Sequence, residues 1–337
     1  MKAVVLVGGE GTRLRPLTET IPKPLIPLVD RPFLDRVLDH LAAHGVEEVL
    51  LSSPYLGERF EAFISRRASP PRVTWIAEAT PLGTGGAIAN AARALDESFF
   101  VLNGDILTDL DLRALLEFHR ANSATATIAV AEVEDARPYG LVALGSTGRI
   151  DEFREKPAER RRGVVNTGTY VLEPEAIAAV PAGNSVSVER EVFPALIEAD
   201  RPVFGFLSPA YWIDLGTPEK YLRATFDLLE GRVGGEAFPT PFVASSAAVS
   251  LRAHLGSWVV VHEGARVGDD AEVEDSVLLA GAEVGEAARV RDSILGPRAI
   301  VGAGALVAGA VLAERATVPP GTVSEGARIS AGQVLSR

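Results

Sequence analysis

Residues 1 to about 230 alternate short apolar runs with segments in which apolar residues recur at helical spacing, as in 33–41. The apolar runs predict strands at 3–7, 47–52, 73–77, 98–102, 125–131, 141–144, 168–172 and 203–207. The amphipathic segments predict helices at 32–44, 57–66, 84–94, 111–121, 173–179, 188–198 and 218–229. This alternation indicates an α/β, Rossmann-like domain with a mainly parallel sheet and helices on both faces.

From Val260 onward the helical periodicity ends and a repeat of 17 residues begins. Three columns of residues carry it: Val267, Val284, Val301 and Val318; Gly268, Gly285 and Gly302; Val260, Val277, Ile294 and Val311. A period near 18 corresponds to three hexapeptides, each with one apolar residue per short strand and small residues at the corners. The repeat therefore predicts a parallel β-helix, similar to the left-handed hexapeptide β-helix of many transferases, with four to five coils.

The change of pattern divides the chain. We expect a first domain over 1–232, a linker over 233–242 rich in glycine and proline, and the β-helix over 243–337. A β-helix with open ends leaves strand edges that need covering, so we expect a homo-oligomer formed through this domain.

Composition narrows the classes of function. The 337 residues include no cysteine, which excludes a disulfide framework and thiolate metal sites. A net charge of −12 argues against binding along a nucleic-acid backbone, but a few cations suffice for a small phosphorylated ligand. The longest apolar stretches are too short for a spanning helix, and the apolar start 3–7 fits a strand better than a signal peptide. We expect a cytoplasmic protein without a membrane partner.

The segment from Gly8 to Thr18 follows the first strand and is rich in glycine. Glycines let backbone N–H groups approach phosphate oxygens, and Arg13 adds a planar cation, so this loop is expected to hold a polyphosphate. A Walker A loop would need a Gly-Lys-Ser/Thr sequence that is absent, and a dinucleotide fingerprint would need glycine where Leu14 stands. A nucleotidyltransferase loop is the third interpretation.

The whole string, followed by Pro22-Lys23-Pro24-Leu25, resembles the sugar-1-phosphate nucleotidyltransferases, also called NDP-sugar pyrophosphorylases. The resemblance is strongest to the bacterial mannose-1-phosphate guanylyltransferases (GDP-mannose pyrophosphorylases). It continues through Pro81-Leu82-Gly83-Thr84-Gly85-Gly86, Asn103-Gly104-Asp105, Glu155-Lys156-Pro157, Val165-Asn166-Thr167-Gly168, Ser187-Val188-Glu189-Arg190-Glu191 and Trp212-Ile213-Asp214-Leu215-Gly216. The β-helical tail also belongs to that architecture.

The resemblance implies attack by a sugar-1-phosphate on the α-phosphorus of a nucleoside triphosphate, with release of pyrophosphate. Because the attacking phosphate is already ionised, the reaction depends on charge neutralisation and positioning rather than on a protein base. A divalent cation, Mg²⁺, would be held by Asp105, which follows the predicted strand 98–102, and by Asp214, which follows Tyr211-Trp212-Ile213. The alternative for each aspartate is a surface or capping acid.

The same resemblance assigns the remaining site residues. Arg13, with backbone amides from Gly9 to Thr12, would bind pyrophosphate, and Lys23 would bind the triphosphate or the reacting phosphates; with Asp105 and Asp214 they form the catalytic set. The nucleotide would be bound by Leu6, Gly8, Gly9, Gly11, Thr12, Arg13, Glu78, Pro81, Gly83 and Thr84. The sugar phosphate would be bound by Gly140, Glu155, Lys156, Asn166 and Glu189. Alternatives are solvated loop lysines for Lys23 and Lys156, a turn for Gly140 and a helix-cap acid for Glu189.

Glu78 bears on the choice of base. Guanine presents adjacent N1–H and N2–H₂ donors, which one carboxylate accepts together, whereas a glutamine suits thymine. Burial of the charge would require that pairing, so Glu78 predicts GTP as donor and GDP-mannose as product; the alternative is a solvent-facing residue at a strand end. Other sugar or cyclitol phosphates and other nucleotides stay open.

Two further classes of function compete. A regulatory subunit that senses nucleotide sugars would be expected to lose loop or metal residues, and Arg13, Lys23, Asp105 and Asp214 are all present. Acyl transfer by the β-helix would need a longer tail. The five histidines, His40, His44, His119, His254 and His262, show no spacing typical of metal ligands.

Overall fold

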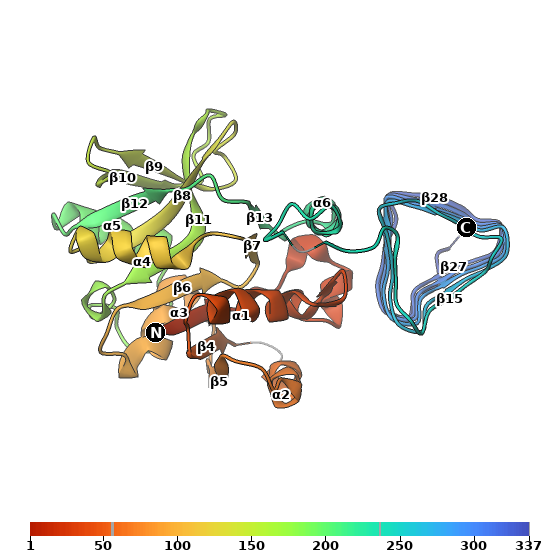
Figure 1. Ribbon diagram of the computed structural model, residues 1–337, viewed down its shortest axis with the longest axis horizontal. Coiled ribbons are helices and arrows are strands. Elements are labelled where there is room, and N and C mark those ends of the chain that lie inside the picture. Colours follow the sequence, from red (N-terminus) through yellow and green to blue (C-terminus); the bar gives the residue numbers. More distant parts are fainter. Residues whose placement is uncertain (55–56, 236, 337) are drawn as a thin grey trace. The chain divides into compact units, whose positions relative to one another are not determined.

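The computed structural model describes residues 1–54, 57–235 and 237–336; residue 236 of the predicted linker and residue 337 of the predicted β-helix lie outside these ranges. The chain forms two compact units, one of residues 1–9 and 34–212 and one of residues 10–33 and 213–337 (Figure 1). The predicted domain limits at 232 and 243 stay a prediction. Within the described part of the chain, no helix combines the length and apolar character needed to cross a membrane.

The first unit contains one large sheet and its covering helices. Its strands are β1 (Lys2–Leu6), β4 (Glu48–Ser53), β5 (Arg72–Ala77), β6 (Phe99–Asn103), β7 (Ile106–Thr108), β8 (Ala126–Val133), β9 (Gly140–Leu144), β10 (Ile150–Glu155), β11 (Gly163–Leu172) and β12 (Val203–Leu207). Its helices are α1 (Phe33–Ala43), α2 (Gly57–Arg66), α3 (Gly83–Ala91), α4 (Leu112–Ala121) and α5 (Phe193–Glu198), with a π-helical turn at Val188–Val192 before α5. Strand β7 is not part of the large sheet. Phe33 and β13 (Trp212–Asp214) mark the change to the second unit.

The order of strands in the sheet is β10-β9-β11-β6-β1-β4-β5, with β8 on β11 and β12 on β8. Strands β6, β1, β4 and β5 are parallel, as the alternation predicted, whereas β11 runs antiparallel to β6, β8 and β9. Leu6 of β1 pairs with Ser52 of β4 and Asn103 of β6, so these three carboxyl ends lie at one edge. That edge is where a parallel sheet binds its ligands.

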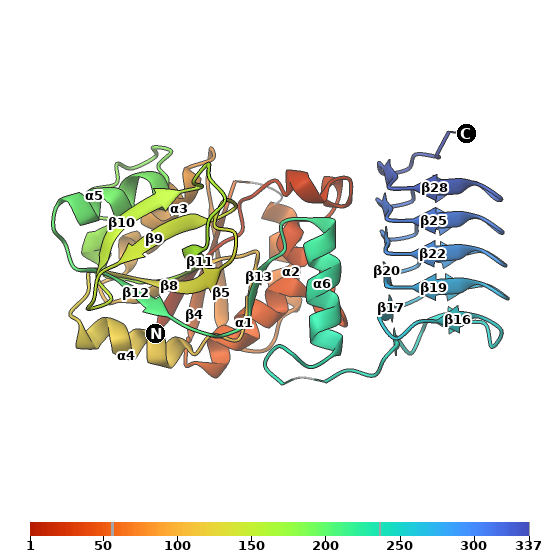
Figure 2. The ribbon, with the colours of Figure 1, turned by 90° about the horizontal axis from the view of Figure 1, so that it is seen from above.

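Helices cover both faces of this sheet. Val4, Leu50, Val101 and Tyr170 share a buried cluster with Ile88 of α3 and residues of α5. Helix α4 contacts β8, β11 and β12, and Figure 2 shows it on the opposite face from α3 and α5. The predicted α/β architecture with helices on both faces is therefore confirmed.

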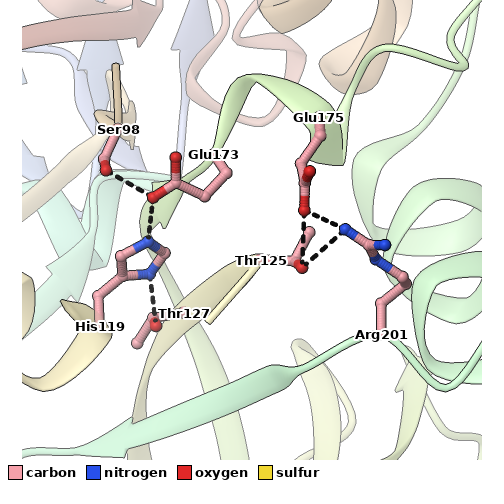
Figure 3. A network of polar contacts seen from close by, with 7 residues as sticks. All are labelled: Ser98, His119, Thr125, Thr127, Glu173, Glu175 and Arg201. Carbon is pink, nitrogen blue, oxygen red and sulfur yellow. Dashed lines mark hydrogen bonds and ion pairs between the residues drawn. The ribbon is translucent and has the colours of Figure 1, made fainter. Parts of the chain in front are cut away.

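The helix predicted at 173–179 is wrong, because only a 3-10 turn forms, at Pro174–Ala176. Its acids are held by residues distant in sequence (Figure 3). Glu173 accepts a hydrogen bond from Ser98 at 2.5 Å and pairs with His119 at 3.0 Å, while Glu175 pairs with Arg201. Burial is the main reason that the pKa of His119 is lowered, and Glu173 opposes that shift.

The second unit carries three short turns at Thr12–Leu14, Leu17–Glu19 and Lys23–Leu25, the strands β2 (Pro27–Leu28) and β3 (Arg31–Pro32), helix α6 (Pro218–Leu229) and the β-helix. The strands of the β-helix are β14 (Phe242–Val243), β15 (Ala248–Val249), β16 (His254–Leu255), β17 (Val259–Val261), β18 (Arg266–Val267), β19 (Glu272–Glu274), β20 (Ser276–Leu278), β21 (Glu283–Val284), β22 (Arg289–Arg291), β23 (Ile294–Leu295), β24 (Ile300–Val301), β25 (Leu306–Ala308), β26 (Val311–Leu312), β27 (Thr317–Val318), β28 (Val323–Glu325) and β29 (Arg328–Ile329). They form three parallel sheets of six, five and five strands, which are those of the predicted left-handed β-helix. Figure 1 shows its three sides and Figure 2 its stacked coils.

The repeat of 17 residues arises at one corner of the coil. The first coil takes 18 residues, because Phe242 pairs with Val260, and the next takes 17, because Val260 pairs with Val277. The shortened corner lies between the third and first sheets, where Asp275 has a left-handed φ of 45°. Ser276 beside it accepts a hydrogen bond from the Ser293 amide of the next coil at 3.0 Å. The Asp-Ser pair that recurs in the sequence thus forms the shortened corner of the coil.

Stability of this unit should depend on pH through His262. Burial lowers the pKa of His262 to about 4, and its Nε2 has no hydrogen-bond partner among the described residues. Because the folded pKa lies below the usual 6.5, the unfolded chain takes up the proton first, and stability falls as pH drops from about 6.5 to 4, by up to about 1.4 kcal/mol per pH unit. Denaturant unfolding of His262→Leu between pH 7.5 and 5 should show a smaller loss than wild type. His254→Leu, at an exposed position, is the control, and an unchanged pH dependence in His262→Leu would contradict the assignment.

Candidate active site

The glycine-rich loop leaves the sheet at the carboxyl end of β1, after the half-buried Leu6. The Val7 amide donates to the Ser52 carbonyl at 3.0 Å and keeps the chain beside β4. A Cβ atom on Gly8 would lie 2.9 Å from Pro54, so position 8 requires glycine. At Gly9 no atom of the described residues lies within 4 Å of such a Cβ, so the backbone there borders open space.

The next part of the loop folds on itself in the second unit. Gly11 has a left-handed φ of 61°, and its carbonyl accepts hydrogen bonds from the Leu14 amide and the Thr18 hydroxyl, both at 2.9 Å. These bonds form the turn that carries the exposed Thr12 and Arg13. A Cβ on Gly11 would lie 3.4 Å from the Cβ of Lys23, so the Lys23 side chain begins next to the loop.

Gly216 brings Arg13 and Asp214 together. The Gly216 amide donates to Asp214 Oδ1 at 3.1 Å. A Cβ on Gly216 would lie 2.4 Å from that oxygen and 2.8 Å from a guanidinium nitrogen of Arg13. Two predicted catalytic residues, far apart in sequence, therefore meet at one glycine.

Lys220 is a member of this cluster that the sequence reasoning missed. Its Nζ forms an ion pair with Asp214 Oδ2. Thr217 caps α6 by accepting from the Lys220 amide at 3.4 Å, which sets Lys220 in the first helical turn. The available signal was the scarcity of lysine, since Lys220 is one of only four in the chain.

Asp105 follows β6 at the same sheet edge as the start of the loop. The Gly104 amide donates to the Leu6 carbonyl at 2.8 Å, and a Cβ on Gly104 would lie 2.6 Å from that oxygen. Glycine at 104 thus lets the chain turn against β1 and present the half-buried Asp105. Asp105 and Asp214 belong to different units, and their convergence on one cation stays a prediction.

The five residues predicted to bind the sugar phosphate are connected through one another. Gly140 pairs with Glu155 across β9 and β10, and a Cβ on Gly140 would lie 3.0 Å from Glu155 Oε2. Lys156 Nζ lies 3.6 Å from Glu155 Oε1, with a side chain 59% exposed. The ammonium group of Lys156 is therefore within ion-pair distance of Glu155, while the side chain is largely open to solvent, so its exposure also suits the solvated-loop alternative.

Glu155 and Glu189 are close enough to interact. Burial raises the pKa of Glu155, and the negative charge of Glu189 raises it further, against the opposing effect of Lys156. Burial and then the charge of Glu189 also raise the pKa of Tyr170, whose hydroxyl accepts a hydrogen bond from Asn166 at 2.8 Å. Tyr170 is thus a central member that sequence reasoning treated only as part of a buried strand.

Thr84 and Glu189, predicted to bind different substrates, contact each other. The Thr84 hydroxyl donates to Glu189 Oε2 at 2.6 Å and accepts from the Val188 amide at 2.9 Å. Gly83 has a φ of 65°, and a Cβ there would lie 2.6 Å from the Val186 carbonyl oxygen. The motif after the exposed Pro81 therefore also has a structural task, which is to join α3 to the segment before α5.

Glu78 is buried, with 8% of its surface exposed, which excludes the solvent-facing alternative. Its Oε1 accepts from Ser52 at 2.8 Å and its Oε2 from the Leu82 amide at 3.1 Å. Each oxygen retains acceptor capacity, because a carboxylate offers about four lone-pair sites. The carboxylate is thus fixed in orientation and able to accept further donors.

The described residues contain no group of three or more histidines or acids that could hold a metal on its own. Mg²⁺ does not need such a group, because it is commonly bound by one or two carboxylates together with waters and substrate phosphates. Asp105 fits that donor type. Asp214 also fits, although its carboxylate already accepts from Gly216 and Lys220.

Comparisons with known proteins agree with these motifs. Residues 2–231 match the family described as Nucleotidyl transferase, and residues 238–337 match the GMPPB C-terminal domain. The chain is similar to a mannose-1-phosphate guanylyltransferase of Mycobacterium tuberculosis, with 41% identity over 82% of this chain and 79% of that protein. It is also similar to mannose-1-phosphate guanylyltransferase 1 of Arabidopsis thaliana, with 34% identity over 83% of this chain and 80% of that protein.

Among solved structures, the chain resembles HddC of Yersinia pseudotuberculosis, crystallised in complex with GMP-PN. The identity is 32%, the TM-score is 0.59, and the match covers 67% of this chain and 98% of HddC. On these matches and on the glycine-rich loop described above, the chain belongs to the nucleotidyl transferase family.

Proposed function

We propose that this protein transfers the guanylyl group of GTP to mannose-1-phosphate, giving GDP-mannose and pyrophosphate. The observation that carries the proposal is the meeting of Arg13 and Asp214 at Gly216, directly after the loop that begins at β1. The names of the similar proteins from Mycobacterium tuberculosis and Arabidopsis thaliana support the same nucleotide and sugar.

In the proposed reaction a phosphate oxygen of the sugar-1-phosphate forms a bond to the α-phosphorus. The bond from that phosphorus to the bridging oxygen breaks, and pyrophosphate leaves with the electron pair. Arg13 and the loop amides stabilise the charge that develops on pyrophosphate, and Lys23 adds a cation from beside Gly11. No side chain needs to remove a proton, since the attacking oxygen is already an anion.

The cluster around Tyr170 would hold the sugar. Glu155, Glu189 and Asn166 offer oxygens that accept hydrogen bonds from hydroxyl groups, and the missing side chain at Gly140 lets Phe153 and Glu155 pack closely against its backbone. Lys156 at the end of β10 would bind the sugar phosphate. Bound hydroxyl donors would also offset the repulsion between the two carboxylates.

Glu78 would recognise guanine. Ser52 and the Leu82 amide hold its carboxylate in place, so the orientation exists before the nucleotide arrives. The N1–H and N2–H₂ donors of guanine then fit its remaining lone pairs, whereas adenine N1 and the carbonyl acceptors of pyrimidines would face an anion without a donor.

A divalent cation, Mg²⁺ in this proposal, would be held by Asp105 and Asp214 and would neutralise charge on both phosphates. Lys220 keeps the Asp214 carboxylate oriented toward the Gly216 amide and the Arg13 guanidinium. The ion pair of Asp214 with Lys220 and the hydrogen bond from the Gly216 amide hold this carboxylate in place, which favours an active enzyme over a silent regulatory subunit. A homo-oligomer and a cytoplasmic location remain part of the proposal.

Specificity for guanine is tested by crossing four nucleoside triphosphates with mannose-1-phosphate, glucose-1-phosphate and a cyclitol phosphate. GTP should be the best donor, and Glu78→Gln should reduce the preference for GTP by about 10-fold or more, the scale of one hydrogen bond to a charged group. Ser52→Ala, which removes a partner of Glu78 but keeps the carboxylate, is the control and should retain the preference for GTP. Poor use of GTP by the wild-type enzyme would overturn the role given to Glu78.

The two aspartates are tested by Asp105→Asn and Asp214→Asn. Each should keep the thermal unfolding midpoint of wild type and lower kcat by about 10²-fold or more, as expected when an electrostatic catalytic group is lost. Asp151→Asn, at an exposed position of β10, should change neither quantity. Near-normal turnover in both variants would remove these residues from the metal site.

Glu155→Gln should raise the stability of the protein and weaken binding of the sugar phosphate. Because its folded pKa is raised above 4.5, Glu155 costs stability as pH rises through that range, and the amide removes this cost along with the repulsion from Glu189. At pH 7 the variant should unfold at a higher temperature yet show a KM for the sugar phosphate about 10-fold higher. Glu152→Gln, exposed on the same strand, is the control, and a less stable Glu155→Gln would contradict the argument.

A further inference from the structure

The outward-facing residues of the β-helix differ among its three sheets. Inward residues such as Val259 and Leu278 belong to the core of the coil, so their neighbours point outward. On the sheet that begins with β14, the outward residues of its four middle strands are apolar and at most 2% exposed: Val260, Val277, Ile294 and Val311. On the other two sheets the matching positions are mainly charged and accessible, for example Arg266, Glu283 and Arg289, and even Ile300 is 40% exposed. We call the first set the apolar face.

Helix α6 lies along this side of the β-helix, in the same compact unit (Figure 2). Phe226 of α6 stacks on Trp258, just before β17, with ring centroids 5.6 Å apart. At the other end of the coil stack, Arg328 of β29 lies 3.7 Å from Glu219 in the first turn of α6. The helix therefore contacts the β-helix near both of its ends.

The last coil also reaches the glycine-rich segment. Glu19 accepts hydrogen bonds from the Ser330 hydroxyl at 3.0 Å and from the Ala331 amide at 3.2 Å. Glu19 ends the short turn Leu17–Glu19, in which Thr18 holds the Gly11 carbonyl of the loop. Two neighbouring residues thus make a contact with the β-helix and a contact that shapes the loop.

A second connection runs through α6. The Tyr221 hydroxyl donates to the Pro27 carbonyl at 2.5 Å, two residues after the turn Lys23–Leu25. The residue before Tyr221 is Lys220, which holds Asp214. The segment 10–33 is therefore fixed on one side by α6 and on the other by the last coil.

We propose that the β-helix braces the glycine-rich loop: its apolar face holds α6, its last coil holds Glu19, and together they set the position of Arg13 and Lys23. Glu19 is a positioning residue, because it belongs to the turn Leu17–Glu19 and contacts the β-helix rather than a substrate. Its hydrogen bonds are exposed and individually weak, so the apolar face supplies the attachment and Glu19 sets the register of the turn. The kinetic consequence rests on the proposed function, but the bracing itself does not.

The apolar face is tested by Ile294→Asp, with Ile300→Asp on an exposed sheet as the matched control. An aspartate at 294 places a charge in the buried contact, so amide hydrogen exchange of residues 10–25 and of α6 should become at least 10-fold faster, while exchange in β1, β4 and β6 stays unchanged. Ile300→Asp should leave all of these rates at the wild-type level. Unchanged exchange of residues 10–25 in a folded Ile294→Asp would overturn the brace.

Glu19→Ala is the milder test and does not disturb the core of the coil. Exchange of residues 11–18 should become 3- to 10-fold faster, and the KM for the nucleotide should rise by a similar factor with kcat within 2-fold of wild type. Glu19→Gln, whose carbonyl oxygen still accepts a hydrogen bond, should return both the exchange rate and the KM most of the way to wild type. Glu263→Ala, at an exposed position of the β-helix, should change neither the exchange rate nor the KM. Exchange at wild-type rates in Glu19→Ala would refute the role of Glu19. Faster exchange without any nucleotide turnover in the wild-type protein would instead refute the proposed function and keep the brace.

Discussion

Arg13 and Asp214 approach each other because position 216 has no side chain. A single Cβ there would overlap both the aspartate oxygen and the guanidinium. The same kind of close approach recurs where Gly104 turns against Leu6 and where Gly140 borders Glu155. The candidate site is therefore built from backbone contacts that bring charged side chains together, and the glycines are as essential to it as the charges.

This dependence explains how much of the site the sequence could predict. A charged residue within two positions of a glycine, shortly after an apolar run, is a local pattern, so Arg13, Asp105 and Asp214 could be found. Glu155 has no such pattern and was found only through the resemblance of Glu155-Lys156-Pro157. Lys220 and Tyr170 were missed, because each looks like an ordinary residue of a helix or a strand, and their contacts with Asp214 and Glu189 form only in the folded chain. The charged strand β10 was missed for a related reason, since only Ile150 and Phe153 of its six residues are buried. The false helix at 173–179 failed because Glu173 and Glu175 are held by His119 and Arg201.

For the β-helix, prediction from the sequence has a different limit. Its repeat was readable because stacking copies one coil onto the next, which makes the period of the sequence the period of the structure. Yet Val260 and Val267 recur with the same spacing, and spacing alone does not distinguish an outward from an inward residue. The distinction lies in the chemistry of the neighbouring columns. An outward column that stays apolar from Val260 to Val311, next to outward columns rich in Arg and Glu, marks a face covered by another part of the protein.

The negative net charge of the chain makes the position of its few local cations important. The substrates proposed here are polyanions, and the chain has a net charge of −12, so attraction by the whole surface is absent and local cations must supply it. Arg13 and Lys23 lie on the segment 10–33, whose turns make hydrogen bonds through Thr18, Glu19 and Tyr221. A cation on a loosely held segment would lose part of its interaction with phosphate to motion and to water. Fixing that segment against a rigid stack of coils is a physical reason for a nucleotidyltransferase domain to carry a β-helix on the same chain.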